Sequence, residues 1–565
     1  MYIVGMHNDE DSGVCLIKDG EILSAINEER LNRIKLYKGL PEKSLSYVLK
    51  EHDLDINMID YFVYGWHGRK IDYRKYSQKL LERTVLSMER NIKSGEILEN
   101  RLEIEISRDD KTRKEFEEWL ITLGIPDNKI KFVDHHKSHA WSAYACSSFN
   151  EAVVFTIDGR GDLKSSSVSY AANGQMKEID YQLSFDSLGF LYGQITHYLG
   201  YMPHRHEGKI TGLAAHGDPD TTIDLFRSMI DYAGNGRIIA NIYPYKPFYT
   251  DIDKELTDEL DKFSSEDISA GLQKHCEEVV SKYITYWIKK LNKKKIDVCL
   301  CGGVTANVKI NQVINELDCV NNIFVFPHMG DGGLPMGSAI QFNYYISKQS
   351  KFKLNNVYLG ASYSNIEIIE ALNNSKGIRY EKLTDKVDYT VNKIASNCVI
   401  GWFEGRMEYG PRSLGARSII YHTKDKTVNR WLNKRLNRTE FMPFAPVTPE
   451  EYAGDCYIGW KKDHISAKYM TRTYECTDKF IEKNPAVVHV DGTARPQIVY
   501  KDDNTEYYNL VKKYCDLTGE KALINTSFNH HEEPIVCSPE DAIKSLINGN
   551  IDVLVMGEYA VYSIN

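Results

Sequence analysis

The sequence has no run of 18 apolar residues, so we expect no segment that spans a membrane. Its first residues, MYIVGMHNDED, lack the basic and apolar regions of a secretory signal peptide. The eleven cysteines are scattered and show no CxxC spacing, which is typical of reduced, cytoplasmic proteins. A net charge of −9 does not favour a dedicated nucleic-acid binder. We therefore expect a cytoplasmic protein with neither a membrane nor a nucleic acid as its partner.

The chain is too long for a single hydrophobic core. At 565 residues, two or three domains are the default expectation. Apolar periodicity disappears near residues 345–356, where the sequence becomes KQSKFKLNN. We place a boundary there and predict one domain over residues 1–350 and a second over residues 357–565.

Two stretches of the first domain share one pattern. Residues 1–30 and 151–181 both suggest a strand, a polar loop, a strand, a tight turn (Asp19-Gly20 or Asn173-Gly174) and a strand. This weak repeat predicts an α/β fold with a duplicated core like that of actin-like and sugar-kinase ATPases, which place nucleotide between the copies. Between the two stretches, residues 96–123 are so highly charged that we expect a solvated pair of helices on the surface.

The segment HHKSHAWSAYACSSFNEAVVFTIDGRGD contains the first candidate site. His135 and His139 lie four residues apart, so on a helix both imidazoles project from one face and could bind one metal ion. The buried-strand pattern that follows ends at Asp158, and a second acidic-glycine turn contains Asp331. No HExxH glutamate separates the histidines, which argues against a metalloprotease. The alternative is a partly exposed histidine pair with no metal.

Glycine-rich turns suggest a nucleotide cleft in the same domain. A strand, two glycines and a helix N-terminus form an anion site, and this order occurs in DVCLCGGVTAN. The segment EGKITG offers a lysine to a phosphate, although such a short motif is also common in ordinary loops. The candidate nucleotide-binding residues are Lys209, Gly212, Gly302, Gly303, Asn307 and Gly332.

Arginines gather among glycines in the second domain. The segment EGRMEYGPRSLGARS contains Arg406, Arg412 and Arg417, and Arg438 follows. The planar guanidinium matches phosphate and carboxylate oxygens, so we favour a phosphorylated ligand over pairing with surface carboxylates.

Several segments carry a specific resemblance. GRMEYGPRSLGARS, HVDGTARPQ and NTSFNHHEEPIVCSPEDAI resemble the C-terminal signatures of the O-carbamoyltransferases of nodulation-factor and antibiotic biosynthesis, a family that includes the tobramycin carbamoyltransferase. NEERLNRIK, TIDGRGD, SLGFLYGQITHYLG, HEGKITGLAAHG, CGGVTANVKIN and MGDGGLPMGSA resemble the N-terminal half. The motifs occur in family order over nearly the whole chain.

The resemblance implies a two-step reaction on two domains. The C-terminal α+β domain, similar to threonylcarbamoyl-AMP synthase, would make carbamoyl-adenylate from carbamoyl phosphate and ATP with Mg²⁺. The N-terminal domain, similar to the tRNA threonylcarbamoyltransferase subunit, would transfer the carbamoyl group to a hydroxyl of a small natural product or sugar beside Fe²⁺ or another divalent transition metal. A homodimer is the commonest oligomeric state.

The resemblance also assigns roles to residues. The implied metal ligands are His135, His139, Asp158 and Asp331, and the implied transfer residues are His7 and Lys35. In the C-terminal domain, phosphate, carbamoyl or nucleotide groups would be held by Arg412, Arg417, Arg438, Arg495, Asn525 and Ser527. The chain departs from the family at Met442 and at His530-His531, where many members have cationic residues.

Two rival hypotheses assign a different function to the chain. A threonylcarbamoyl-type transferase would act on tRNA, which the acidic balance disfavours. A non-enzymatic actin-like nucleotide sensor would not need the arginines of the second domain. The sequence does not identify the acceptor.

Overall fold

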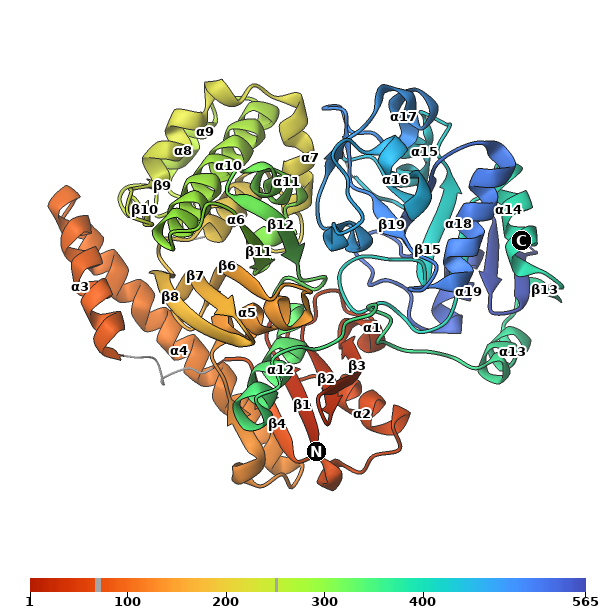
Figure 1. The fold of residues 1–565 in the computed structure, drawn as a ribbon, viewed down its shortest axis with the longest axis horizontal. Helices are drawn as coiled ribbons and strands as arrows, with labels where there is room; N and C mark the ends of the chain where they lie inside the picture. Colours follow the sequence, from red (N-terminus) through yellow and green to blue (C-terminus); the bar gives the residue numbers. More distant parts are fainter. Residues whose placement is uncertain (67–72, 249–251, 440, 565) are drawn as a thin grey trace. The chain divides into compact units, whose positions relative to one another are not determined.

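The computed structural model describes residues 1–66, 73–248, 252–439 and 441–564 (Figure 1). The chain divides into two compact units, each with a mixed α/β fold. The first comprises residues 1–23, 38–41 and 47–353, and the second comprises residues 24–37, 42–46 and 354–565. Among the helices of the described residues, none combines the length and apolarity needed to cross a membrane.

Two five-stranded sheets form the framework of the first unit, and they repeat one strand order. The first has the order β3-β2-β1-β4-β5, with strands β1 (Tyr2–His7), β2 (Gly13–Lys18), β3 (Glu21–Asn27), β4 (Tyr61–Tyr64) and β5 (Ile130–Phe132). The second has the order β8-β7-β6-β11-β12, with strands β6 (Glu151–Gly161), β7 (Lys164–Ala172), β8 (Gln175–Leu183), β11 (Ile296–Cys301) and β12 (Val320–Val325). In both, the central strand runs antiparallel to the next strand in sequence and parallel to a later one. The repeat predicted from the sequence is therefore present as a shared topology.

Two helices cross between these sheets (Figure 1). Helix α5 (His135–Cys146) follows the first sheet but packs on β6 and β11, whereas α12 (Leu334–Ser347) follows the second sheet but packs on β1 and β4. The helices can approach this closely because residue 337 is a glycine: a Cβ there would lie 2.4 Å from the Ser138 carbonyl oxygen. The Ser138 hydroxyl also donates to Gln341 Oε1 at 2.8 Å. This crossing brings the first turns of α5 and α12 together.

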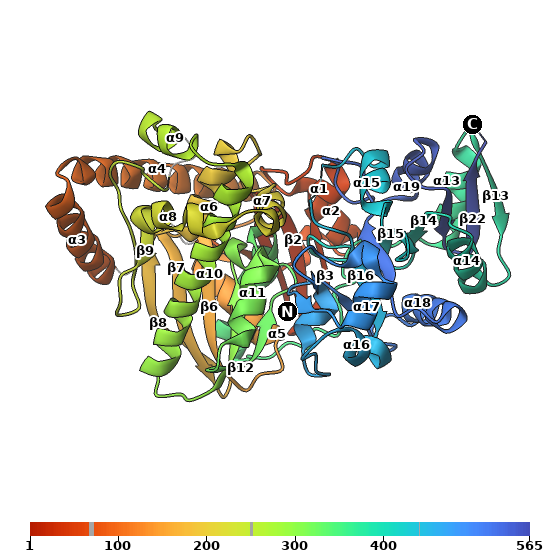
Figure 2. The same cartoon turned by 90° about the horizontal axis from the view of Figure 1, so that it is seen from above.

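A helical hairpin extends from one side of the first unit (Figure 2). It consists of α3 (Tyr73–Arg90) and the thirty-residue α4 (Lys93–Thr122). The predicted pair of solvated helices over residues 96–123 is wrong, since this stretch is one helix. It is also not solvated all round: Glu105 and Asp109 are buried, and they hydrogen-bond to Ser184 and Arg160.

The remaining helices of the first unit cover the second sheet and its loops. The long helix α10 (Ser265–Lys290) supplies much of the apolar core through residues such as Leu272, Val279 and Ile284. Around it lie α6 (Leu188–Tyr198), α7 (Glu207–Leu213), α8 (Ile223–Met229), α9 (Lys254–Leu260) and α11 (Val308–Glu316).

The second unit is built on one mixed eight-stranded sheet. Its order is β13-β22-β21-β14-β15-β20-β16-β19, with strands β13 (Ile378–Lys382), β14 (Ile400–Phe403), β15 (Arg417–His422), β16 (Ala445–Pro449), β19 (Gln497–Val499), β20 (Leu523–Ser527), β21 (Val553–Met556) and β22 (Tyr559–Ser563). Side chains alternate between its faces. Ile419 joins α13 (Asn365–Asn374) and α19 (Pro539–Ile547) in one core, and Ile420 joins α14 (Lys386–Ala395) and α18 (Thr505–Thr518) in the other.

Residues 24–37 belong to the second unit through specific hydrogen bonds. The Arg33 guanidinium donates to the carbonyls of Pro534 and Ile535 at 2.8 Å, and the Ala25 amide donates to the Leu359 carbonyl at 3.0 Å. Residues 24–37 are therefore part of the second unit although they come early in the chain.

Candidate metal centre and arginine loop

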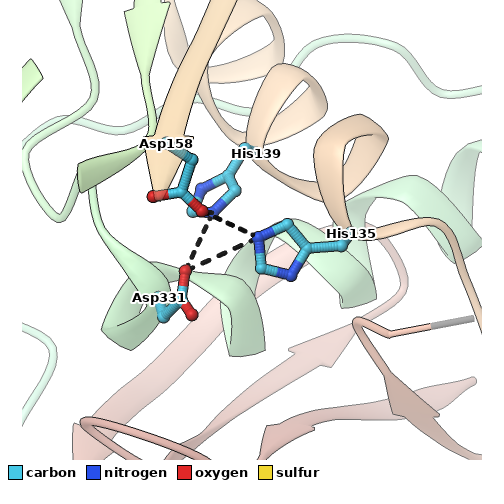
Figure 3. A group of neighbouring side chains, drawn as sticks. All are labelled: His135, His139, Asp158 and Asp331. Atoms are coloured by element: carbon cyan, nitrogen blue, oxygen red, sulfur yellow. Dashed lines mark hydrogen bonds and ion pairs between the residues drawn. The ribbon is translucent and has the colours of Figure 1, made fainter. Parts of the chain in front are cut away.

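Four side chains meet where α5 and α12 begin (Figure 3). Each of His135, His139, Asp158 and Asp331 offers one ligand atom, and these atoms all lie within 4.8 Å of one another. His135 Nε2 lies 3.2 Å from Asp158 Oδ2, and His139 Nε2 lies 3.2 Å from Asp331 Oδ1. Ligand bonds of about 2.1 Å place neighbouring ligand atoms of one ion roughly 3.0–3.4 Å apart. The cluster thus fits one transition-metal ion, and its two nitrogens and two oxygens suit iron, manganese or zinc.

The start of α5 is fixed by two aspartates. Asp134 is the N-cap and accepts from the Lys137 amide at 2.8 Å, while Asp162 accepts from the His135 amide at 2.8 Å. Gly161 leaves room for the imidazole, because a Cβ there would lie 2.1 Å from the His135 ring. Since α5 continues beyond His139, both imidazoles project toward the same point, as the i, i+4 spacing predicts.

The two predicted glycines of the CGG turn position Asp158. The Gly303 amide donates to Asp158 Oδ1 at 2.8 Å, which leaves Oδ2 to face the histidines. Gly302 has φ +91°, and a Cβ there would lie 2.4 Å from the Ile157 carbonyl oxygen. These glycines therefore support the metal cluster directly, and any contact with nucleotide stays a prediction.

The electrostatics of the cluster favour a cation. Burial lowers the pKa of His135, but Asp331 and the hydrogen bond to Asp158 outweigh it and raise this pKa to about 9. Burial would raise the pKa of Asp158, yet its bond to His135 and the nearby histidines hold it below its usual range. The carboxylates that favour a proton on His135 also favour a divalent cation in the place of that proton.

His7 ends strand β1 beside this cluster. Its Nε2 lies 4.0 Å from Asp331 Oδ2, and neither ring nitrogen has a hydrogen-bond partner among the residues that the structure describes. Burial lowers its pKa to about 4 despite the opposing effect of Asp331. A neutral imidazole is thereby available at the site. Lys35, the other residue proposed for transfer, lies half-buried in a turn of the second unit.

The sequence reading missed the part that α4 plays here. Arg160, two residues after Asp158 on β6, is buried and donates through both terminal nitrogens to Asp109 at 2.6 and 3.1 Å. Its guanidinium carbon lies 5.3 Å from the centre of the Trp66 ring, which meets His135 edge-on with ring centroids 4.6 Å apart. The sequence pattern that could have revealed these contacts is the spacing of acidic and basic residues on one face of α4, at positions 105, 108 and 109.

The other predicted nucleotide-binding residues are mostly occupied within the protein. Asn307 caps α11 through its side-chain oxygen and donates to Gln273 Oε1 at 2.7 Å and to Thr211 Oγ1 at 3.3 Å. Lys209 and Gly212 are buried in α7. A Cβ at Gly332 would lie 2.1 Å from Asp11 Oδ2, so this glycine permits a close approach of two loops.

In the second unit, one glutamate organises the arginine-bearing loop. The buried Glu408 accepts through Oε1 from the amides of Leu414 at 2.7 Å, Ala416 at 2.6 Å and Arg417 at 3.2 Å. Gly415 lies between them with φ +109°, packed where a Cβ would lie 2.2 Å from the Tyr507 ring. The loop that carries Arg412 is therefore rigidly held.

Arg417 is buried and holds the loop through its side chain. Its side chain has 0% exposure and stacks on Phe403, with the guanidinium carbon 3.7 Å from the ring centre. Its terminal nitrogens donate to backbone carbonyls of residues 361, 404, 405 and 416. Its terminal nitrogens therefore hold the loop, whereas Nε is buried with no hydrogen-bond partner among the described residues. The assignment of Arg417 to a ligand stays a prediction.

Arg438 has a similar role at the end of β20. It donates to Thr526 Oγ1, to the Ser527 carbonyl and to both oxygens of Asn529, at 2.6–2.9 Å. It therefore positions Ser527. The other predicted residues divide by exposure: Arg412, Arg495 and Ser527 are half-buried, whereas Asn525 is buried.

These features define a mixed α/β protein of two units, with a candidate metal centre in the first and an ordered arginine loop in the second. Residues 2–340 match the family model described as carbamoyltransferase N-terminus, and residues 391–563 match the carbamoyltransferase C-terminus. The chain belongs to the carbamoyltransferase family and is an enzyme of that class.

Similar proteins cover the whole chain. The nodulation protein NolNO of Sinorhizobium fredii is 30% identical over 98% of this chain and 78% of its own length. The uncharacterized protein MJ1051 of Methanocaldococcus jannaschii is 31% identical over 100% of both chains. Among solved structures, the activator of 2-hydroxyisocaproyl-CoA dehydratase from Clostridium difficile is 13% identical, with a TM-score of 0.34 over 60% of this chain and 94% of that one. A TM-score this low carries no argument about function.

Proposed function

We propose that this carbamoyltransferase is an ATP-dependent O-carbamoyltransferase that makes carbamoyl-adenylate in its second unit and uses it in its first. The observation that carries the proposal is the buried cluster of His135, His139, Asp158 and Asp331 in a chain whose two halves both match carbamoyltransferase models. The cluster provides a transfer site, and the held arginine loop of the other unit provides a separate site for phosphates.

The first step joins the carbamoyl group to AMP. For the atoms to balance, carbamoyl phosphate gives carbamate and inorganic phosphate with the entry of one water. A carbamate oxygen then bonds to the α-phosphorus of ATP, and pyrophosphate leaves. Arg412 and Arg495 would bind phosphate oxygens bidentately, with Mg²⁺ neutralising the triphosphate. Glu408, Arg417 and Arg438 keep the surrounding backbone in place.

The second step moves the carbamoyl group to a hydroxyl. The acceptor oxygen bonds to the carbamoyl carbon, AMP leaves, and the hydroxyl proton goes to a base. His7 is the candidate base because it is neutral, buried and next to the cluster. A metal held by the four ligands would polarise the carbonyl as a Lewis acid, and Fe²⁺ is the proposed ion. Lys35 would stabilise the charge that develops.

The finer fold assignment belongs to the same proposal. The shared strand order of the two sheets supports a duplicated actin-like core for the first unit. The second unit would be a synthase-like domain related to threonylcarbamoyl-AMP synthase.

A small molecule is the proposed acceptor. Several relatives are named nodulation proteins, which supports a hydroxyl of a sugar or a natural product over tRNA. The net charge of −9 also favours a small molecule over nucleic acid. The proposal also includes a cytoplasmic location and a homodimeric state for the protein.

The test separates the units. Purified protein with ATP, Mg²⁺ and carbamoyl phosphate, but with no acceptor, should release pyrophosphate and form a species with the mass of carbamoyl-adenylate. Arg495→Ala should abolish both products, whereas His135→Ala, which changes the other unit, should retain both. A wild-type protein that makes neither product with iron and ATP present would refute the proposal.

A further inference from the structure

Two side-chain amides in the second unit form a short hydrogen-bonded chain. Asn525 on β20 donates through Nδ2 to the Ser413 carbonyl at 3.1 Å and to Gln497 Oε1 at 2.6 Å. Gln497 on β19 donates through Nε2 to the Leu414 carbonyl at 2.7 Å. Both amides are almost fully buried, and both donate hydrogen bonds to the loop that carries Arg412.

This chain fixes which way each amide points. A backbone carbonyl only accepts, so the atoms that face Ser413 O and Leu414 O have to be amide nitrogens. Gln497 must then turn its oxygen toward Asn525. Both hydrogens of Asn525 Nδ2 are used, and only the oxygen Oδ1 remains to meet anything else.

That oxygen is buried and has no hydrogen-bond partner within the described part of the chain. The hydroxyl oxygen of Ser413, one residue from Arg412, is also buried with no such partner. Buried acceptors in native proteins nearly always have a donor, so an orphan of this kind indicates a ligand or an ordered water. On β20, Ser527 lies two residues further on and so shares a sheet face with Asn525. The acceptor thus lies among the residues proposed to bind substrate.

We propose that Asn525 Oδ1 selects a ligand by accepting a hydrogen bond from its NH₂ group, and that Gln497 is a positioning residue that engages Nδ2 and so leaves this oxygen as the free end of the amide. The inference rests on the proposed synthesis of carbamoyl-adenylate. Two substrates of that reaction carry an NH₂ group: carbamoyl phosphate on its carbonyl carbon and ATP on its adenine ring. An acyl phosphate with a methyl group would leave the oxygen unpaired, and sites built to hydrogen-bond a substrate N–H strongly reject analogues that lack it.

The experiment compares substrates with and without this NH₂ group. Pyrophosphate release by the full-length protein is measured with carbamoyl phosphate against acetyl phosphate, and with ATP against inosine triphosphate, which lacks the adenine NH₂. In Asn525→Leu, one of the two kcat/KM ratios should fall by about 100-fold or more, because only the NH₂-bearing substrate loses an interaction. A fall in the first ratio assigns the oxygen to the carbamoyl group, and a fall in the second assigns it to adenine.

Two further variants separate selection from stability. Gln497→Leu frees one hydrogen of Asn525, so the same ratio should fall by a smaller factor. Asn550→Leu removes another buried amide of this unit, which donates to Ser545 Oγ at 3.0 Å, and should leave both ratios unchanged. Asn525→Ser replaces Asn525→Leu if the latter does not fold by circular dichroism.

The outcomes distinguish this inference from the proposed function. A wild-type protein that releases no pyrophosphate from carbamoyl phosphate contradicts the proposed function itself. An active wild type whose two ratios change by less than threefold in a folded Asn525 variant overturns the role of Asn525 alone.

Discussion

Replacing Glu408 by glutamine should damage the second unit and leave the metal centre intact. The Glu408 carboxylate accepts three backbone hydrogen bonds while buried, so it is the hub of residues 414–417. Glutamine keeps one acceptor oxygen but loses the charge that strengthens all three bonds. Hydrogen bonds to charged groups contribute about 1.5–3 kcal/mol and neutral ones about 1 kcal/mol. The loss should therefore be roughly 2–4 kcal/mol of unfolding free energy.

Glu408→Ala should cost more, since it leaves three buried amides without an acceptor. Each such amide costs about 1–3 kcal/mol, partly recovered where water enters. The matched control is Glu404→Gln, because the Glu404 carboxylate pairs with Lys386 Nζ at 2.7 Å in a partly exposed position. An exposed pair is worth about 0–1 kcal/mol.

The assay follows unfolding, pyrophosphate release and metal content in the same preparations. Glu408→Gln should lower the unfolding temperature and slow pyrophosphate release at least tenfold, with metal content unchanged. Stability equal to that of Glu404→Gln, or a loss of metal with normal pyrophosphate release, would refute the claim that Glu408 organises the loop.

Three further predictions concern separate sites. His139→Ala should weaken divalent-metal affinity by more than about 100-fold in equilibrium dialysis, and an unchanged affinity would contradict the assigned ligand set. Asp109→Asn should cost about 3–5 kcal/mol by leaving Arg160 buried without its charge partner, whereas Lys111→Gln, which breaks an exposed pair, should cost under about 1 kcal/mol in denaturant titrations. Burial, aided by Arg472, lowers the pKa of His464 to about 4 in the folded protein. As the pH falls below about 6.5, His464 is therefore protonated in the unfolded chain before it is protonated in the folded one. Unfolding free energy should therefore fall by up to about 3 kcal/mol between pH 6.5 and 4, and His464→Gln should flatten that part of the curve.

Much of the first unit could be predicted from local patterns. The β-branched run of residues 152–157 and the two tight turns at Gly20 and Gly174 specify strands and hairpins, and the structure has both. The spacing of His135 and His139 specifies a shared helix face once the segment is helical. Asp331 joins them only because α12 crosses to the first sheet, and its assignment rested on its acidic-glycine turn and on the family resemblance.

Tertiary packing decided the features that were wrong or missed. The charges of α4 suggested a solvated surface, because a sequence does not show that Asp109 finds Arg160 some fifty residues away. The bonds from Arg417 to the loop were also missed, because a buried guanidinium that satisfies backbone carbonyls has the same sequence signature as one that binds phosphate. Exposure and hydrogen-bond partners separate the two, and both depend on the whole sheet.

The crossing of α5 and α12 has a consequence for the order in which the chain is made. Residues 1–132 complete the first sheet on the ribosome, yet the helix that covers β1 and β4 ends only at Ser347. The apolar face of that sheet is therefore covered only after more than 200 further residues have been made, whereas α5 can pack on β6 as soon as that strand, which begins at Glu151, has been made. Synthesis should pass through a stage in which His135 and His139 are already in a packed helix and half of the unit is still uncovered. Asp331 arrives last, so a complete set of four ligands marks a first unit whose two halves have closed on each other.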